Sequence, residues 1–432
     1  MKTALGTCLR SLLVTSLALW PLAAAQQSEH PVLLLNEDES FHFELLNALS
    51  EAIYSGADVN PILRVAKDLP PGDFESYSQA FQELANQTKA QAEDPKNAYD
   101  SVNVRDTWFS AANYFRRADF YRHGNWDDPL INILWDEQTA AFNKAIAALP
   151  VPGQRLQIPA DNFTVEAIWY PVKTDDNTQR PTFILGNGYD GAQEDLYHTF
   201  VVAAHARGWN AITYEGPGHP TVRRNQNIGF IPDWERVVTP VVDYLLTNQS
   251  CAVDPSRVAL LGFSFGGYLA ARAAAFDPRI SAVLLDGGVW DTFKAFYDQL
   301  PPPAQKLFDS GNASAFDAAV LEAIHAPGAP TSLRWGAEQG LWSFNMRSPY
   351  EYLQLTKEFA VEEWIDQIDM PTWVADATYE EVFPGQAKKV ADALGDRATF
   401  HLFEGSAGYH VQAGAFQELN RVMFAWLNET LG

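Results

Sequence analysis

Ser264, Glu380 and His410 carry the side chains of a nucleophile, an acid and a base, in that order along the chain. Ser264 is the centre of the stretch 262–266 (GFSFG), which follows a short apolar run and precedes an alanine-rich one. A serine between a buried strand and a helix sits on a sharp turn, where glycines let the two elements pack closely. Its hydroxyl becomes a nucleophile when a positioned base removes the proton. The pattern predicts nucleophilic catalysis by Ser264 rather than a chance glycine-rich loop.

His410 is the expected base, because it lies in the loop after the last strand-like segment, 398–403. Two other histidines have simpler structural interpretations. His401 lies within that strand and should point into the sheet layer. His198 follows Glu194 by four residues, which is the spacing of a pair on a helix surface.

The acid is expected in the loop after the strand-like segment 371–375. Glu380 fits the usual offset from such a strand best. Glu381 and Asp376 stay open as alternatives, and Asp376 is close enough to the strand to pin the loop by hydrogen bonds instead. Asp286, at the end of another strand, is a more distant alternative.

An acyl-transfer site also needs two N–H groups aimed at the developing oxyanion. We expect one from Phe265 and the other from Gly188 or Tyr189, in the glycine-rich loop 186–191. Plain turn formation would explain those glycines too. Asp190 is expected beside the site, where it either handles a substrate proton or caps the following helix.

The turn 214–219 (YEGPGH) after another strand is expected to be structural. The chain lacks metal-ligand spacing, a phosphate-cradling loop and a dinucleotide fingerprint. The sequence therefore predicts neither a metal nor a cofactor.

The net charge of −24 argues against nucleic acid or an anionic membrane surface as a partner. Residues 1–25 have a basic start, an apolar stretch and small residues at their end, as in a cleaved signal peptide. Five glycosylation sequons agree with secretion. They begin at Asn86, Asn162, Asn248, Asn312 and Asn428. We expect a protein of the secretory-pathway lumen or the exterior, without a membrane span after cleavage.

Residues 26–150 have helical periodicity and end at a Pro-Val-Pro-Gly breaker, which predicts a helical cap domain. From 151 to 432, strand-like and helical segments alternate, which predicts a mostly parallel sheet covered by helices on both faces. About residues 290–369 leave that rhythm and are expected to form a helical lid inserted into this catalytic domain.

Several motifs together resemble one family of α/β-hydrolases, which includes bacterial 2,6-dihydropseudooxynicotine hydrolase and the fungal yellowish-green pigment hydrolase that shortens polyketides. The resemblance covers about residues 100–430. The matching segments are 188–191 with 193–194, 214–218, 262–266, 383–386 and 408–414. It implies the α/β-hydrolase fold, with Ser264, His410 and Glu380 as triad and Asp190 as a substrate-binding residue. The family usually has Asp where Glu380 stands, which keeps the identity of the acid open.

The resemblance further implies cleavage of a carbon–carbon bond next to a carbonyl, in a 1,3-dicarbonyl or polyketide-like substrate of fungal secondary metabolism. It is also the sole reason to expect a homodimer. An esterase or lactonase with the same triad, and a non-catalytic binding protein, are the two alternatives. Aromatic residues of the lid point to an apolar or aromatic carbonyl substrate, although core packing explains them equally well. They are Trp290, Phe293, Phe296, Tyr297, Trp335, Trp342 and Phe344.

Overall fold

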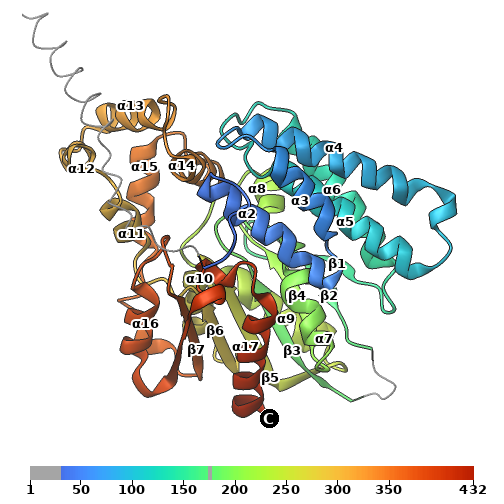
Figure 1. Cartoon of the computed structure of the whole chain (residues 1–432). Helices are drawn as coiled ribbons and strands as arrows, with labels where there is room; N and C mark the ends of the chain where they lie inside the picture. Colours follow the sequence, from blue (N-terminus) through green and yellow to red (C-terminus); the bar gives the residue numbers. More distant parts are fainter. Residues whose placement is uncertain (1–30, 174–177) are drawn as a thin grey trace, which may run out of the picture.

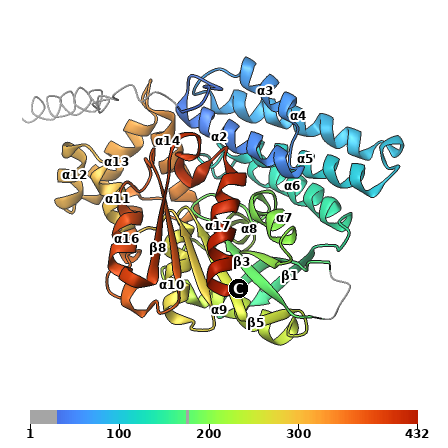
Figure 2. The same cartoon turned by 60° about the horizontal axis from the view of Figure 1, so that its bottom comes forward.

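The computed structural model describes residues 31–173 and 178–432, so the signal segment expected at 1–25 lies outside the described residues. An eight-stranded sheet forms the centre of the molecule, in the order β1-β2-β4-β3-β5-β6-β7-β8 (Figures 1 and 2). Strand β2 is antiparallel to β1 and β4, and every other neighbouring pair is parallel. The strands are β1 Gln154–Pro159, β2 Thr164–Tyr170, β3 Arg180–Gly186, β4 Asn210–Glu215, β5 Val253–Phe263, β6 Ala282–Asp286, β7 Thr372–Ala377 and β8 Ala398–Phe403.

The middle of β5 is apolar on both sides because helices cover both faces of the sheet. Val258 and Leu260 pack in one apolar cluster, with α9 (Glu235–Asn248), α10 (Gly266–Phe276) and α16 (Gln386–Leu394). Ala259 and Leu261 pack in the other, with α7 (Val202–His205) and α17 (Phe416–Leu431). The predicted parallel sheet between two helical layers is confirmed.

Among the described residues, five α-helices precede the sheet, and the last two of them contribute side chains to its apolar core. They are α2 Glu39–Ser50, α3 Val59–Asp68, α4 Phe74–Glu93, α5 Ser101–Asp119 and α6 Leu130–Ala147. Helix α5 is buried on two sides: Phe109 joins the cluster on the sheet, whereas Phe115 joins a separate cluster among the cap helices. The cap is therefore fixed to the sheet layer through α5.

A second group of helices lies between β6 and β7. It comprises α11 Thr292–Asp298, α12 Pro302–Asp309, α13 Ala313–Ile324, α14 Thr331–Ser343 and α15 Pro349–Leu355. Phe308, Phe316 and Leu353 give this group a small apolar cluster of its own. In Figure 1 these orange helices lie at the upper left, the cap helices α3–α6 at the upper right, and α2 with α14 between them, above the strands.

The sequence did not reveal β1 and α8 (Pro220–Gln226). Polar residues alternate poorly with apolar ones in β1, which is an edge strand paired on one side with β2. The segment around His198, expected to be helical from its spacing to Glu194, is a π-helical turn, Tyr197–Val201, that continues into α7. Within residues 31–173 and 178–432, no helix combines the length and the apolar character needed to cross a bilayer.

Candidate active site

Ser264 occupies the turn between β5 and α10 with φ of 61°, a left-handed conformation that costs a non-glycine residue energy. Its N–H donates to the carbonyl of Asp286, 2.7 Å away. A Cβ on Gly262 would lie 1.9 Å from the carbonyl oxygen of Gly266, and one on Gly266 would lie 2.7 Å from that of Asn187. Both glycines are therefore required by close backbone packing around the serine.

His410 follows β8, and its Nε2 lies 2.8 Å from Ser264 Oγ. The next two residues, Val411 and Gln412, both have positive φ, 48° and 52°. The loop also pairs with the loop after β7, where the Tyr379 N–H donates to the Gly408 carbonyl at 2.8 Å. A strained and pinned loop thus holds the imidazole against the serine.

Glu380 Oε2 lies 2.5 Å from His410 Nδ1. Its other oxygen accepts from the N–H groups of Val382 (2.8 Å) and Phe383 (2.9 Å), so the loop backbone fixes the carboxylate. Of the two alternatives nearby, Asp376 accepts from the Ala377 N–H at 2.9 Å, and Glu381 is exposed. The structure brings Ser264, His410 and Glu380 together and leaves Asp376 and Glu381 outside this chain of hydrogen bonds.

The charges of this pair are mutually stabilising. Burial alone would lower the pKa of His410, but the adjacent Glu380 carboxylate outweighs burial and raises that pKa above its usual range. Burial would raise the pKa of Glu380, but the charge and hydrogen bond of His410 bring it below its usual range. Glu380 is therefore an ionised partner that favours the imidazolium formed when His410 accepts a proton.

Asp286 is a second buried carboxyl beside this pair, at the end of β6. Burial raises its pKa to about 7, opposed by the positive charge of His410. With its amide oriented to donate, Gln412 Nε2 lies 3.0 and 3.2 Å from the two carboxyl oxygens. Asp286 therefore anchors the histidine loop through Gln412, whereas Glu380 holds the ring itself.

The glycine-rich loop after β3 packs directly on the serine turn. A Cβ on Gly188 would lie 2.6 Å from the Phe263 carbonyl oxygen and 2.9 Å from the Phe265 nitrogen. The Gly188 N–H already donates to Asn187 Oδ1 at 2.8 Å. In the part of the chain that the structure describes, no hydrogen bond occupies the N–H of Tyr189 or of Phe265. These two, rather than Gly188, are the N–H groups with free donor capacity beside Ser264.

The turn at 214–219 braces that loop, a role the sequence did not specify. The buried ring of His219 contacts the Asn187 carbonyl through Nε2 at 3.2 Å, and its Nδ1 accepts from the Gly216 N–H. The Glu215 carboxylate accepts from the N–H groups of Gln193 and Thr221, at 2.9 and 2.6 Å. Each side chain ties the loop after β4 to the loop after β3.

Asp190 is half-buried next to the site. Burial raises its pKa, and Arg116 opposes this through its charge, with Nη2 donating to the Asp190 carbonyl at 2.8 Å. Capping of the next segment falls to another residue, because the Ala192 N–H donates to Asp195 Oδ2. Of the two roles expected for Asp190, the structure thus removes capping.

The two rival histidines lie away from Ser264. His401 is half-buried in β8, with its ring stacked 6.4 Å from that of Trp373. The prediction for His198 was wrong: it is buried under the cap, and its Nδ1 contacts the Tyr54 carbonyl at 3.0 Å. Glu194, its expected partner, pairs with Arg155 instead.

Helix α2 lies over the loop that carries His410, which sequence reasoning missed. His42 Nε2 lies 3.1 Å from the Tyr409 hydroxyl, and the ring of Phe43 lies 6.4 Å from that of His410. More than 360 residues separate these partners. A contact over such a separation leaves no local pattern that could have identified it.

The seven aromatic residues of the lid divide into two groups. Phe296, Phe344 and Trp335 lie 6.2 to 6.3 Å from the ring of Tyr189. The other four pack in structural clusters or on cap residues: Trp290, Phe293, Tyr297 and Trp342. Three of the seven thus build an apolar wall beside Tyr189.

Comparison with known proteins agrees with this fold. The model of the alpha/beta hydrolase family matches residues 183–416. The chain is 29% identical to hydrolase LUC6 of Fusarium sp, over 91% of this chain and 96% of that protein. It is 27% identical to 20-hydroxy-prefusarin hydrolase FUS2 of Gibberella moniliformis, over 90% and 96%. The crystal structure of 2,6-dihydroxy-pseudo-oxynicotine hydrolase superimposes with a TM-score of 0.68 at 18% identity, over 88% of this chain and 95% of that one.

The family match covers more than half of the chain, and the sheet and its helical layers are those of the same fold. The chain therefore belongs to the alpha/beta hydrolase family and is a hydrolase. The predicted fold class and the predicted family resemblance are both confirmed.

Proposed function

We propose that the protein is a serine hydrolase in which Ser264 attacks a substrate carbonyl while His410 takes its proton. Glu380 orients His410 and stabilises the imidazolium. The N–H groups of Phe265 and Tyr189 donate hydrogen bonds to the oxyanion. The observation that carries the proposal is the continuous contact from Ser264 through His410 to Glu380, at 2.8 and 2.5 Å.

We propose further that the bond cleaved is a carbon–carbon bond next to a carbonyl, in a 1,3-dicarbonyl or polyketide-like substrate of fungal secondary metabolism. The resemblance noted above supports this. So does FUS2, whose name gives 20-hydroxy-prefusarin as its substrate. The aromatic wall beside Tyr189 suits a substrate of low polarity.

The proposed reaction has two stages. Addition of Ser264 Oγ gives a tetrahedral oxyanion, whose collapse breaks the carbon–carbon bond and expels an enolate. The imidazolium of His410 protonates the enolate carbon, leaving Ser264 acylated. His410 then removes a proton from water, and the resulting hydroxide displaces the acyl group as a carboxylic acid, returning the proton to Ser264.

The test compares an aryl 1,3-diketone with the ester in which an oxygen is inserted between the aryl carbonyl and the central methylene. Wild-type protein and Ser264→Ala are incubated with each, and the products are read by mass spectrometry. We expect acid and ketone from the diketone, lost in Ser264→Ala. Cleavage of the ester alone would indicate an esterase. Cleavage of neither compound, by a folded protein whose Ser264 also takes up no fluorophosphonate label, would indicate a binding protein.

We also propose that the protein passes through the secretory pathway. All five sequon asparagines are exposed: Asn86, Asn162, Asn248, Asn312 and Asn428. Protein from a fungal host should start after residue 25 and lose mass on endoglycosidase treatment. An intact amino terminus without attached glycans would contradict this route.

A further inference from the structure

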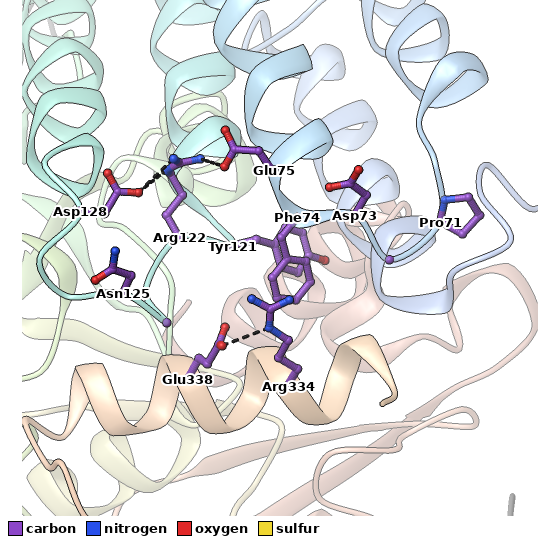
Figure 3. A pocket seen from close by; sticks show the side chains of 12 residues that line it. Pro71, Asp73, Phe74, Glu75, Tyr121, Arg122, Asn125, Asp128, Arg334 and Glu338 are labelled. Atoms are coloured by element: carbon purple, nitrogen blue, oxygen red, sulfur yellow. Dashed lines mark hydrogen bonds and ion pairs between the residues drawn. The ribbon is translucent and has the colours of Figure 1, made fainter. Parts of the chain in front are cut away.

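A cavity of about 560 Å³ lies on the seam between the cap and helix α14. The cap contributes the segments 71–75 and 121–128, and α14 contributes Arg334 and Glu338 (Figure 3). We refer to this cavity as the cap–lid cleft. It is distinct from the Ser264 contacts described above, and nothing in the triad requires it.

The charges in the cap–lid cleft are paired and sum to an excess of acid. Arg122 pairs with Glu75 at 3.0 Å and Asp128 at 2.9 Å, and Arg334 pairs with Glu338 at 3.1 Å (Figure 3). Both cations of the cleft are already paired with carboxylates and its four acids outnumber them, so the charge of the cleft disfavours a ligand carboxylate or phosphate.

A row of aromatic rings in contact extends from the cleft toward Ser264. Tyr121, which lines the cleft, meets Trp335 edge-on at 6.4 Å, and Trp335 meets Tyr189 edge-on at 6.3 Å. Phe120 stacks flat on Trp335 at 5.1 Å. Tyr189 in turn is next to Gly188, the residue packed on the serine turn. The indole of Trp335 thus lies between the cleft and the proposed oxyanion loop.

The indole Nε1 of Trp335 is buried without a hydrogen-bond partner in the described chain. A buried donor left unpaired costs about 1–3 kcal/mol, so such a group calls for an explanation. The Tyr77 hydroxyl and Trp135 Nε1 are unpaired too, but those side chains are almost completely enclosed in the cap. Trp335 differs because the residue is only half-buried and its ring meets that of Tyr121, which lines the cleft.

We propose that the cap–lid cleft is the outer part of the substrate-binding site, with Trp335 Nε1 donating to a substrate oxygen remote from the scissile carbonyl. The ligand is an uncharged molecule with an apolar body that packs on the rings and a ketone or hydroxyl oxygen that accepts from the indole. This inference rests on the proposed function, because it assumes that Ser264 is the nucleophile.

The test uses p-nitrophenyl octanoate and a series of p-nitrophenyl oxo-octanoates. The members of the series are isomers of one another and differ in the position of one ketone along the acyl chain. We expect wild-type protein to favour at least one ketone ester in kcat/KM by about two- to tenfold over octanoate, the range of one neutral hydrogen bond. Trp335→Phe keeps a ring on Phe120 but removes the donor, and should bring that ratio to about one. Trp342→Phe, the same change on the same helix, should keep the wild-type ratio.

A second variant tests the cleft itself and does not depend on the folding of Trp335→Phe. Glu75→Trp places an indole in the cleft and should raise KM for the favoured ketone ester several-fold. Val102→Trp, at an exposed cap position outside the cleft, should not. A ketone preference that persists in Trp335→Phe, no preference in the wild type, or equal KM values for Glu75→Trp and Val102→Trp would overturn the inference. In each of these three outcomes the proposed function would still stand if the protein hydrolyses the esters and its Ser264 is labelled by a fluorophosphonate. If the protein shows neither hydrolysis nor labelling, the proposed function and this inference would both be overturned.

Discussion

The two sides of Ser264 are built by different kinds of contact. On the core side, loops at the ends of parallel strands are joined by backbone hydrogen bonds, such as Ser264 N–H to Asp286 and Tyr379 N–H to Gly408. On the cap side, helices meet through side chains from distant parts of the chain. His123 contacts Gln339 at 2.5 Å, and the Thr331 hydroxyl donates to Asp38.

Half of the strained non-glycine backbone positions lie on the core side, at Ser264 and directly after His410. Among the described residues, six non-glycine residues have positive φ, and three of them are Ser264 and the two that follow His410. Strain of this kind persists where the surrounding structure over-determines the conformation. The comparison teaches that the chemistry is held by backbone at strand ends, whereas the cap and α14 shape the space for the substrate.

The largest effect expected on the core side comes from Glu380. Glu380→Gln should lower kcat by about 10³- to 10⁴-fold, because the neutral amide no longer stabilises the imidazolium or selects its tautomer. Glu381→Gln, an exposed neighbour in the same loop, should change kcat by less than about twofold. Steady-state kinetics on any turned-over ester checks both, and equal losses would refute the assignment of the acid.

Helix α14 offers a matched pair on the cap side. A Cβ on Gly340 would lie 2.0 Å from the Tyr189 hydroxyl, whereas one on Gly336 would meet nothing within 4 Å. Gly340→Ala should displace Tyr189 and lower kcat/KM by about 10- to 100-fold. Gly336→Ala should keep kcat/KM and raise the free energy of unfolding slightly, because alanine favours a helix. Similar kinetics for the two variants would show that α14 does not position Tyr189.

The pH dependence of kcat/KM separates the effect of burial on the pKa of His410 from the effect of the Glu380 charge on that pKa. Only the neutral ring accepts a proton, and Glu380 raises its pKa above the ordinary value of about 6.5, so wild-type activity should fall on the acid side with a pKa above that value. In Glu380→Gln the carboxylate is absent but burial remains, and the acid limb should move to lower pH. An unmoved limb would mean that Glu380 does not set this pKa.

The smallest expected effect concerns stability on the cap side. Arg117 pairs with two buried carboxylates, Glu44 and Glu51, and burial still raises the pKa of Glu44 to about 7 and that of Glu51 as well. A carboxyl with a raised folded pKa binds more protons folded than unfolded, so stability falls as pH rises above its unfolded value. The histidines whose pKa burial lowers to about 4, His198 and His219, oppose this only below about pH 6.5.

Between about pH 6.5 and 8, the Tm should therefore fall by a few degrees. Glu51→Gln removes one of the buried carboxyls with a raised pKa and should make that slope less steep. Differential scanning calorimetry across this range checks it. A Tm that rises with pH over the same interval would contradict the assigned direction of these pKa shifts.

What the sequence could predict follows the same division. The serine turn was recognisable because strand, glycines and helix are adjacent in the chain, and His410 because it follows the last strand. The choice of Glu380 over Glu381 depends on which carboxylate accepts hydrogen bonds from the N–H groups of Val382 and Phe383. Two adjacent glutamates in a sequence do not reveal this.

The cap side was largely beyond sequence reasoning. The prediction for His198 was wrong because its partner, the Tyr54 carbonyl, lies 144 residues away in the sequence. The position of α14 between the cap and Tyr189 is fixed by contacts such as Tyr189 hydroxyl to Gly336 carbonyl, at 2.6 Å and 147 residues apart. Helical periodicity identifies such an element but not the surface on which it packs.

The most direct test of the account is covalent labelling by a fluorophosphonate, with the modified peptide located by mass spectrometry. We predict one adduct, on Ser264, which is absent in Ser264→Ala and forms far more slowly in His410→Gln. Labelling of another serine, or a folded wild-type protein that takes up no label, would contradict the central claim that Ser264 is the nucleophile of a working triad.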